Sequence, residues 1–140
     1  MRLRATAATC GAVIAFAVCA SQAGAVPSRT SSASDTKSWC AAVIRANTNA
    51  GTMKNKRFLP VDQVPAATWK KVVDLAVAQG DRFIALAPNE IRTAVKHEIA
   101  WFKRIKANHY SRNTPLAPWT LAEIKQITNF ERTKCGIRFS

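Results

Sequence analysis

The sequence predicts an all-α fold, an up-down-up-down four-helix bundle closed by one disulfide, and three observations support this prediction. Apolar residues recur about every 3.6 residues along four stretches of the chain, which is the period of an amphipathic helix. Glycine and proline are sparse inside those stretches, and the sequence has neither an alternating strand pattern nor an internal repeat. Cys40 and Cys135 lie near the start of the first stretch and the end of the last, and these two places meet at one end of such a bundle.

The first helix is expected from Asp35 to Ala50. Ser34 is its expected N-cap, because a serine hydroxyl accepts a hydrogen bond from an unpaired N–H of the first turn. Gly51 is expected to end the helix. The basic segment 52–60, TMKNKRFLP, is then expected to form a loop.

The second helix is expected to begin near Pro65, because proline lacks the N–H that a first helical turn leaves unpaired. Its apolar face runs from Trp69 to Ala87, and Gly80-Asp81 is expected to kink or split it. The pair Pro88-Asn89 then forms a turn.

The third helix is expected from Glu90 to Asn108, and the loop 111–119 connects it to the fourth. Thr120 and Glu123 have the T-x-x-E spacing of a capping box, which indicates a helix start, and Gly136 indicates its end. The expected inner face of the fourth helix consists of Leu121, Ile124, Ile127 and Cys135.

Residues 1–25 have the three parts of a secretory signal peptide. Arg2 and Arg4 give a positive start, an apolar run follows, and Ala23-Gly24-Ala25 is a small-residue cleavage site. The apolar run is about half of the ~20 residues that span a bilayer, so no integral membrane span is expected. We therefore expect a secreted, extracellular protein cleaved after Ala25, with a flexible arm over 26–34 and one helical domain over 35–140.

Cleavage would leave two cysteines, Cys40 and Cys135. An even pair in an exported protein is most simply a disulfide, and closing so long a loop would contribute about 4–5 kcal/mol. A metal site is the competing interpretation, but the two cysteines lack C-x-x-C spacing. We predict neither a metal nor a cofactor.

The charge balance is strongly basic, with 21 lysines and arginines against 8 acidic residues and a net charge of +13. Loss of the two signal-peptide arginines lowers this to +11. Such a field attracts anions, and outside a cell these are wall polymers, anionic lipid surfaces and nucleic acid. The alternative is that the charge serves solubility alone.

A basic face is predicted on and after the third helix, and the loop cations Lys54, Lys56 and Arg57 could extend it. Its outer side carries no interleaved aromatic residues, so non-specific contact with a polyanion is favoured over sequence-specific recognition. The predicted polyanion-binding residues are Arg92, Lys96, Lys103, Lys106 and Arg112.

A zinc-protease helix is excluded, because His97-Glu98 is followed at the second ligand position by Trp101 instead of histidine. The sequence has no G-x-S-x-G, P-loop or dinucleotide-binding motif, and we assign no catalytic residue. A hydrolase with a dispersed site remains a third hypothesis, and it requires a histidine within hydrogen-bond reach of a Ser or Thr hydroxyl.

Three polar residues fall on apolar faces, Asn47 on the first helix, Glu98 on the third and Glu131 on the fourth. A buried carboxylate without a partner is costly, so a polar network or a position near a helix end is one interpretation. The alternative is a small-ligand carrier with a pocket in or at the end of the bundle, suited by its acidity to a cationic ligand. The candidate pocket residues are Glu98, Glu131, His109, Tyr110 and Trp119.

The segment Asp81–Ala107, DRFIALAPNEIRTAVKHEIAWFKRIKA, resembles small exported helical proteins of actinobacteria in which an Ala-Pro-x-Glu-Ile turn joins two helices. Proteins of that group often carry Pro-Pro where this chain has Pro88-Asn89. The resemblance implies export and a helical fold, and it brings no catalytic residue. The leading hypothesis is a non-enzymatic helical protein that associates with an anionic polymer or surface outside the cell.

Overall fold

The computed structural model describes residues 33–139, and most of this range is helical. The predicted signal peptide, and the arm up to residue 32, lie outside the described residues. The elements are α2 (Ala33–Ala50), β1 (Met53–Lys54), β2 (Arg57–Phe58), the 3-10 turn η1 (Val61–Gln63), α3 (Ala66–Ala78), α4 (Gly80–Leu86), α5 (Arg92–Ala107) and α6 (Leu121–Cys135).

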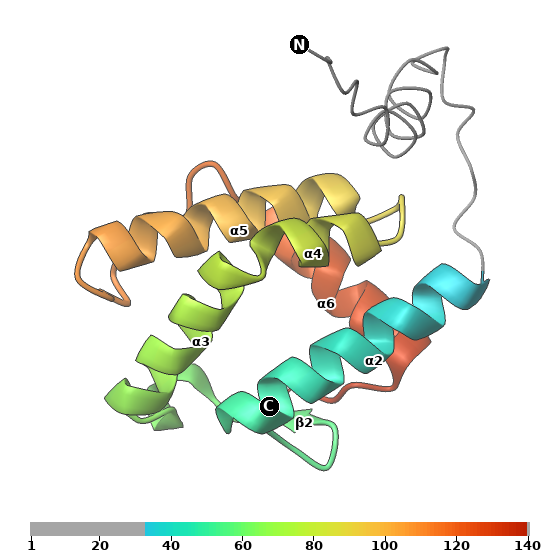
Figure 1. Cartoon of the computed structure of the whole chain (residues 1–140), viewed down its shortest axis with the longest axis horizontal. Helices are drawn as coiled ribbons and strands as arrows, with labels where there is room; N and C mark the ends of the chain where they lie inside the picture. The colour runs from blue at the N-terminus through green and yellow to red at the C-terminus, as the bar shows by residue number, and fades with distance from the viewer. Residues whose placement is uncertain (1–32, 140) are drawn as a thin grey trace, which may run out of the picture.

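In Figure 1, α3 is oblique to both α2 and α5, whereas α4 runs nearly along α5. Both α3 and α4 pack against α5, whereas α2 packs against α6. The expected second helix is divided at Gln79 into α3 and α4, and α3 runs obliquely to α5 (Figure 1). The helical character is therefore confirmed, but the up-down-up-down four-helix topology is not.

Local end signals in the sequence are borne out at α6. Thr120 and Glu123 form both hydrogen bonds of the capping box, and Gly136 adopts a left-handed conformation with φ of 66° at the helix end. At the amino end of the domain the boundary differs, because α2 begins at Ala33 and Ser34 lies within it instead of capping it. Leu121 was expected on the inner face of α6 but is 66% exposed, and Phe130 and Glu131 are buried there instead.

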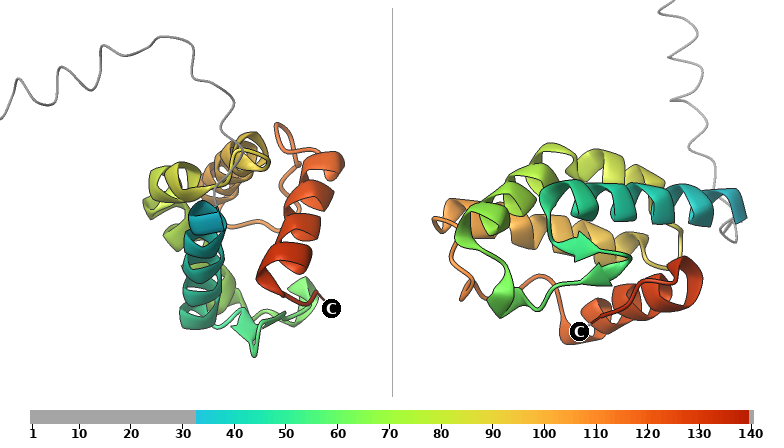
Figure 2. Two further views of the ribbon diagram at one scale, coloured as in Figure 1. Left: turned by 90° about the vertical axis from the view of Figure 1, so that its right-hand side faces the viewer. Right: turned by 90° about the horizontal axis from the view of Figure 1, so that it is seen from below.

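A small hairpin, absent from the sequence prediction, replaces the expected loop after α2. Met53 pairs with Phe58 across two strands, and the turn residues Asn55 and Lys56 both have positive φ. The residues after α6 extend this hairpin, since the Phe58 amide donates to the Arg138 carbonyl at 2.9 Å. Figure 2 shows the hairpin beside the carboxyl end of the chain.

The predicted disulfide between Cys40 and Cys135 is confirmed, with the two Cα atoms 5.2 Å apart. It fastens the second turn of α2 to the last residue of α6. The core beside it takes side chains from every helix. Its buried members include Trp39, Val43, Ile91, Val95, Ile99, Ile127, Phe130 and Ile137.

Gly80 lets α4 approach α5 closely. A Cβ atom at this position would lie 2.5 Å from Cγ2 of Ile99, well inside van der Waals contact. The contact between the start of α4 and α5 therefore requires a residue without a side chain at position 80.

We expect Gly80→Ala to lower the free energy of unfolding by about 1–3 kcal/mol, because the added methyl overpacks the contact. Helix propensity alone would make Gly80→Ala stabilising by about 0.5–1 kcal/mol. A decrease in the free energy of unfolding would therefore indicate the packing clash. Urea unfolding measures it. In an Ile99→Ala background the penalty should vanish or reverse, and an equal penalty in both backgrounds would contradict this packing.

Candidate functional site

A cavity of about 220 Å³ lies between α2, α3 and α5, with the chain around the hairpin forming part of its wall. Most of its lining is apolar. The lining residues are Trp39, Val43, Ala46, Asn47, Thr52, Phe58, Leu59, Val64, Trp69, Val72, Leu75, Ala76, Phe83, Val95, Glu98, Ile99, Phe102 and Glu131. Five of them are aromatic, which makes the lining rich in π faces.

Two carboxyl groups share this cavity, Glu98 from α5 and Glu131 from α6. Glu131 is 6% exposed, and Glu98 is half-buried. Among the described residues, no hydrogen bond or ion pair reaches either carboxyl group. The sequence prediction therefore placed these two residues correctly on inner faces, and the structure brings them to one cavity.

The surroundings keep both carboxyl groups protonated at pH values where an exposed glutamate is charged. Burial raises the pKa of Glu98 to about 7. Burial raises the pKa of Glu131 to about 8, and the nearby charge of Glu98 contributes to this shift. A carboxyl group in an apolar site without a counter-charge favours its neutral form. The cavity thus holds two acids whose charge a bound cation would stabilise.

The indole N–H of Trp39 is a further polar group beside the cavity. Its Nε1 atom is buried, and it has no hydrogen-bond partner within the described chain. The Trp39 ring packs edge-on against Phe83 with centroids 6.2 Å apart.

Asn47 has a structural role at the rim of the cavity. Its Nδ2 group donates to the Val43 carbonyl at 3.0 Å, and its Oδ1 accepts from the Thr52 hydroxyl at 2.9 Å. These bonds hold the turn at the end of α2. For this residue the polar-network interpretation is therefore the better one.

The three other predicted pocket residues lie outside the cavity. Trp119 is buried against Trp101, with ring centroids 5.1 Å apart. The Tyr110 hydroxyl donates to Asp74 at 2.9 Å, and the Tyr110 carbonyl accepts from the Trp69 indole at 2.9 Å. His109 is exposed. The end of the fold where a pocket was expected is filled by aromatic packing and by a loop fastened to α3.

Asp74 is the centre of that loop attachment, and sequence analysis missed it. Its carboxylate contacts Lys70 at 2.7 Å and Lys106 at 2.9 Å in addition to Tyr110. The hydrogen bond from Lys70, followed by those from Lys106 and Tyr110, holds the pKa of Asp74 well below its usual range. The sequence did contain a signal for this role, because Asp74 is an acidic residue four positions after Lys70, the spacing of an ion pair on one helix.

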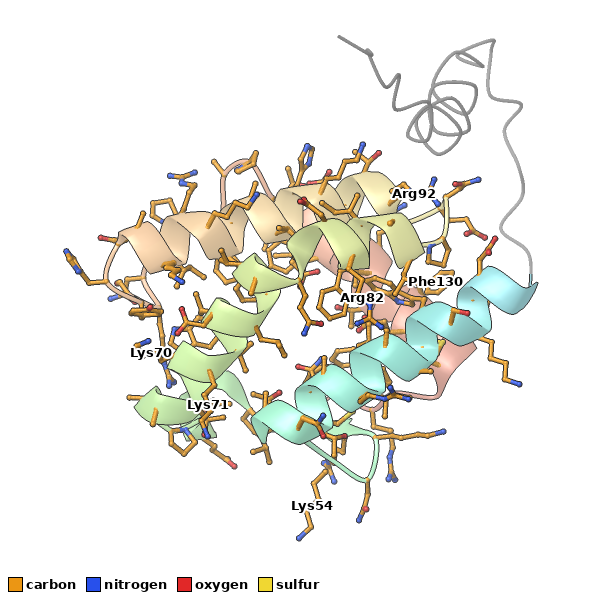
Figure 3. All side chains as sticks on the ribbon, in the orientation of Figure 1. Lys54, Lys70, Lys71, Arg82, Arg92 and Phe130 are labelled. Atoms are coloured by element: carbon orange, nitrogen blue, oxygen red, sulfur yellow. A yellow bond between two sulfur atoms is a disulfide. The ribbon has the colours of Figure 1, made fainter. Side chains whose placement is uncertain are left out.

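The predicted basic face is partly used within the molecule. Arg92 donates to the Ala87 carbonyl at 3.0 Å, Lys106 pairs with Asp74, and Arg112 reaches the Val64 carbonyl and the face of Trp69. Lys96 and Lys103 are exposed on α5. Figure 3 shows Arg92 near the start of α5, far from Lys70 and Lys71 on α3.

His97 Nδ1 lies 2.7 Å from a carboxylate oxygen of Glu123, the same residue that closes the capping box. Glu123 has a lowered pKa, chiefly because the Thr120 backbone N–H donates to it. In the described chain no histidine is hydrogen-bonded to a hydroxyl, as the dispersed-hydrolase hypothesis requires. Nor do residues 33–139 contain a group of three His, Cys, Asp or Glu residues placed to hold a metal ion.

No helix within the described range has the length and apolar character needed to cross a membrane. Comparisons of the chain with protein-family models, with curated protein sequences and with solved structures find no match.

We expect the protein to lose stability as the pH rises from about 4.5 to about 8. Glu98 and Glu131 keep their protons in the folded state up to about pH 7 and 8, whereas the unfolded chain releases them near 4.5. Between these pH values the folded state binds more protons than the unfolded chain, so its free energy of unfolding falls as the pH rises. The total decrease is about a few kcal/mol. Denaturant unfolding at several pH values measures this slope.

Glu131→Gln keeps the shape of the side chain and removes its titration. This variant should be more stable than the wild type at pH 8 and should flatten the slope. Glu90→Gln removes the same charge from an exposed position and is the matched control. If Glu131→Gln and Glu90→Gln left the slope equally steep, the carboxyl group of Glu131 would not be held in an apolar site.

Proposed function

We propose that this protein is a carrier that binds a small organic cation in the cavity, with Glu98 and Glu131 recognising the positive charge. The observation that supports this most strongly is that two carboxyl groups share one apolar cavity and have no cationic partner in the described chain. Buried charges in proteins are normally paired. A ligand cation would supply the missing charge.

The volume of the cavity limits the ligand to a small molecule. A dry cavity of about 150 Å³ accommodates benzene in another protein, so about 220 Å³ corresponds to roughly nine non-hydrogen atoms. The aromatic rings in the lining favour an ammonium group placed over a ring face. An amine with a compact apolar body therefore matches both the size and the chemistry.

A second function is compatible with the first, namely association of the exported protein with an anionic polymer. We propose export from the signal-peptide pattern of residues 1–25 and from the resemblance of Asp81–Ala107 to exported helical proteins. The disulfide between Cys40 and Cys135 is consistent with an oxidising compartment. The net charge of +11 after the predicted cleavage and the exposed lysines Lys96 and Lys103 support attraction to a polyanion.

2-Phenylethylamine, which is cationic over the relevant pH range, is a suitable probe for the cavity. We expect it to bind at about pH 9 at least tenfold more tightly than at about pH 6, because both carboxyl groups are charged only at the higher pH. Isothermal titration calorimetry measures the affinity. Glu131→Gln should lower the affinity at pH 9 roughly tenfold.

The neutral isostere 2-phenylethanol is the matched control, and its affinity should be weak and independent of pH. Equal binding of the alcohol and the amine at every pH would mean that the cavity recognises apolar shape without charge. Failure of both to bind would remove the carrier proposal.

For the second function, we expect retention of the protein on an immobilised polyanion and a steep dependence of that retention on salt, because polyanion binding releases counterions. Cation-exchange beads of the same charge density but without a polymer are the control, because they show the retention that charge attraction alone produces. Elution from the polyanion at low salt, despite the high positive charge, would contradict this function.

A further inference from the structure

Three cations form one row across the hairpin and the residues after α6. Lys54 lies directly opposite Arg57 in the antiparallel pair β1–β2, and Arg57 is bridged on its other side to Arg138. Like charges that lie directly opposite one another destabilise a pair of strands. Three cations in one row therefore concentrate positive charge at this edge of the hairpin, where a bound anion would reduce their mutual repulsion.

The same three cations line one surface hollow of about 520 Å³. Its remaining lining consists of Asn55, Phe58, Leu59, Pro60 and Gln63, and it includes no acidic residue. All three cations are exposed. Lys54 extends away from the helices in Figure 3. The hollow thus presents positive charge and amide groups to the solvent.

The backbone fixes this arrangement. The Arg138 amide donates to the Lys56 carbonyl at 2.8 Å, and the Phe58 amide donates to the Arg138 carbonyl at 2.9 Å. The Arg138 guanidinium donates to the Asn55 carbonyl at 3.1 Å, which orients it and leaves other N–H donors of its fork for a ligand. Since neighbouring strands are about 4.8 Å apart, the row extends over roughly 10 Å.

We propose that this hollow binds a polymer with repeated phosphate groups, through Lys54, Arg57 and Arg138. The proposal rests on the second proposed function and locates it on the hairpin instead of on α5. The row is longer than one phosphate group, so the cations can meet successive phosphates of one chain. On α5, Arg92 donates to the Ala87 carbonyl and Lys106 pairs with Asp74, whereas the hollow gathers three cations in one row.

Inorganic polyphosphate is the probe, and its affinity for the disulfide-bonded protein is measured by calorimetry at several salt concentrations. Lys54→Gln/Arg57→Gln should lower the affinity at least tenfold and reduce the slope of log affinity against log salt by about two. Lys96→Gln/Lys103→Gln removes the same charge from α5 and should lower the affinity less than about threefold. Single inorganic phosphate should bind far more weakly than the polymer.

The outcomes separate this inference from the function on which it rests. Equal losses in the two double variants would mean that net charge alone binds the polymer, and the hollow would be rejected while polyanion association stands. No binding by the wild-type protein at low salt would reject polyanion association itself. If the hairpin variant aggregates but binds polyphosphate normally, the row protects a sheet edge and the inference is wrong.

Arg57 also contributes to the hairpin, and Lys54→Gln/Arg57→Gln could therefore unfold the protein. In that case two single-lysine variants are compared instead. Charge reversal at one exposed lysine, Lys54→Glu against Lys96→Glu, changes the net charge equally and leaves the arginines in place. Polyphosphate affinity should fall several-fold further for Lys54→Glu. Equal affinities for these two variants would overturn the inference.

Discussion

Two carboxyl groups enclosed by apolar side chains are the constraint on which the rest of this structure depends. Glu98 and Glu131 come from different helices and line one cavity, and neither receives a partner from the described chain. Removing such groups from water opposes folding, whether they stay neutral or become charged. A fold that keeps them in place needs stabilisation elsewhere, and it gains a site where a positive charge is favoured.

That stabilisation comes from attachments around the cavity. The Cys40–Cys135 disulfide fixes α2 to α6, the helix that carries Glu131, so the two walls cannot separate. On the opposite side, Asp74 and Trp69 of α3 hold the loop after α5 through Tyr110. The charged groups of this loop attachment are paired, whereas the carboxyl groups in the cavity have no partner in the described chain. This contrast supports the proposal that a ligand cation meets them.

Sequence patterns predicted the local features and missed most long-range ones. The capping box of Thr120 and the stop at Gly136 are local, and they are as expected. Glu98 and Glu131 interrupt a helical apolar period, so they could be found without a structure. The hairpin could not, because two-residue strands are too short to show alternation and its turn uses Asn55 and Lys56 without glycine. The close contact between Gly80 of α4 and Ile99 of α5 is also a long-range feature, and no periodicity reveals it.

The cavity and the basic hollow share a wall, since Phe58 and Leu59 line both. Among the described residues, the cavity is lined by two acidic residues and no basic one, and the hollow by three basic residues and no acidic one. The most direct test of the inner site is carbon-13 NMR of the glutamate side-chain carboxyl groups during a pH titration. We expect Glu98 and Glu131 to titrate near pH 7 and pH 8, and Glu123 below the ordinary glutamate range. Titration of Glu98 and Glu131 near 4.5 would show that both carboxyl groups are solvated and would contradict an apolar, charge-recognising cavity.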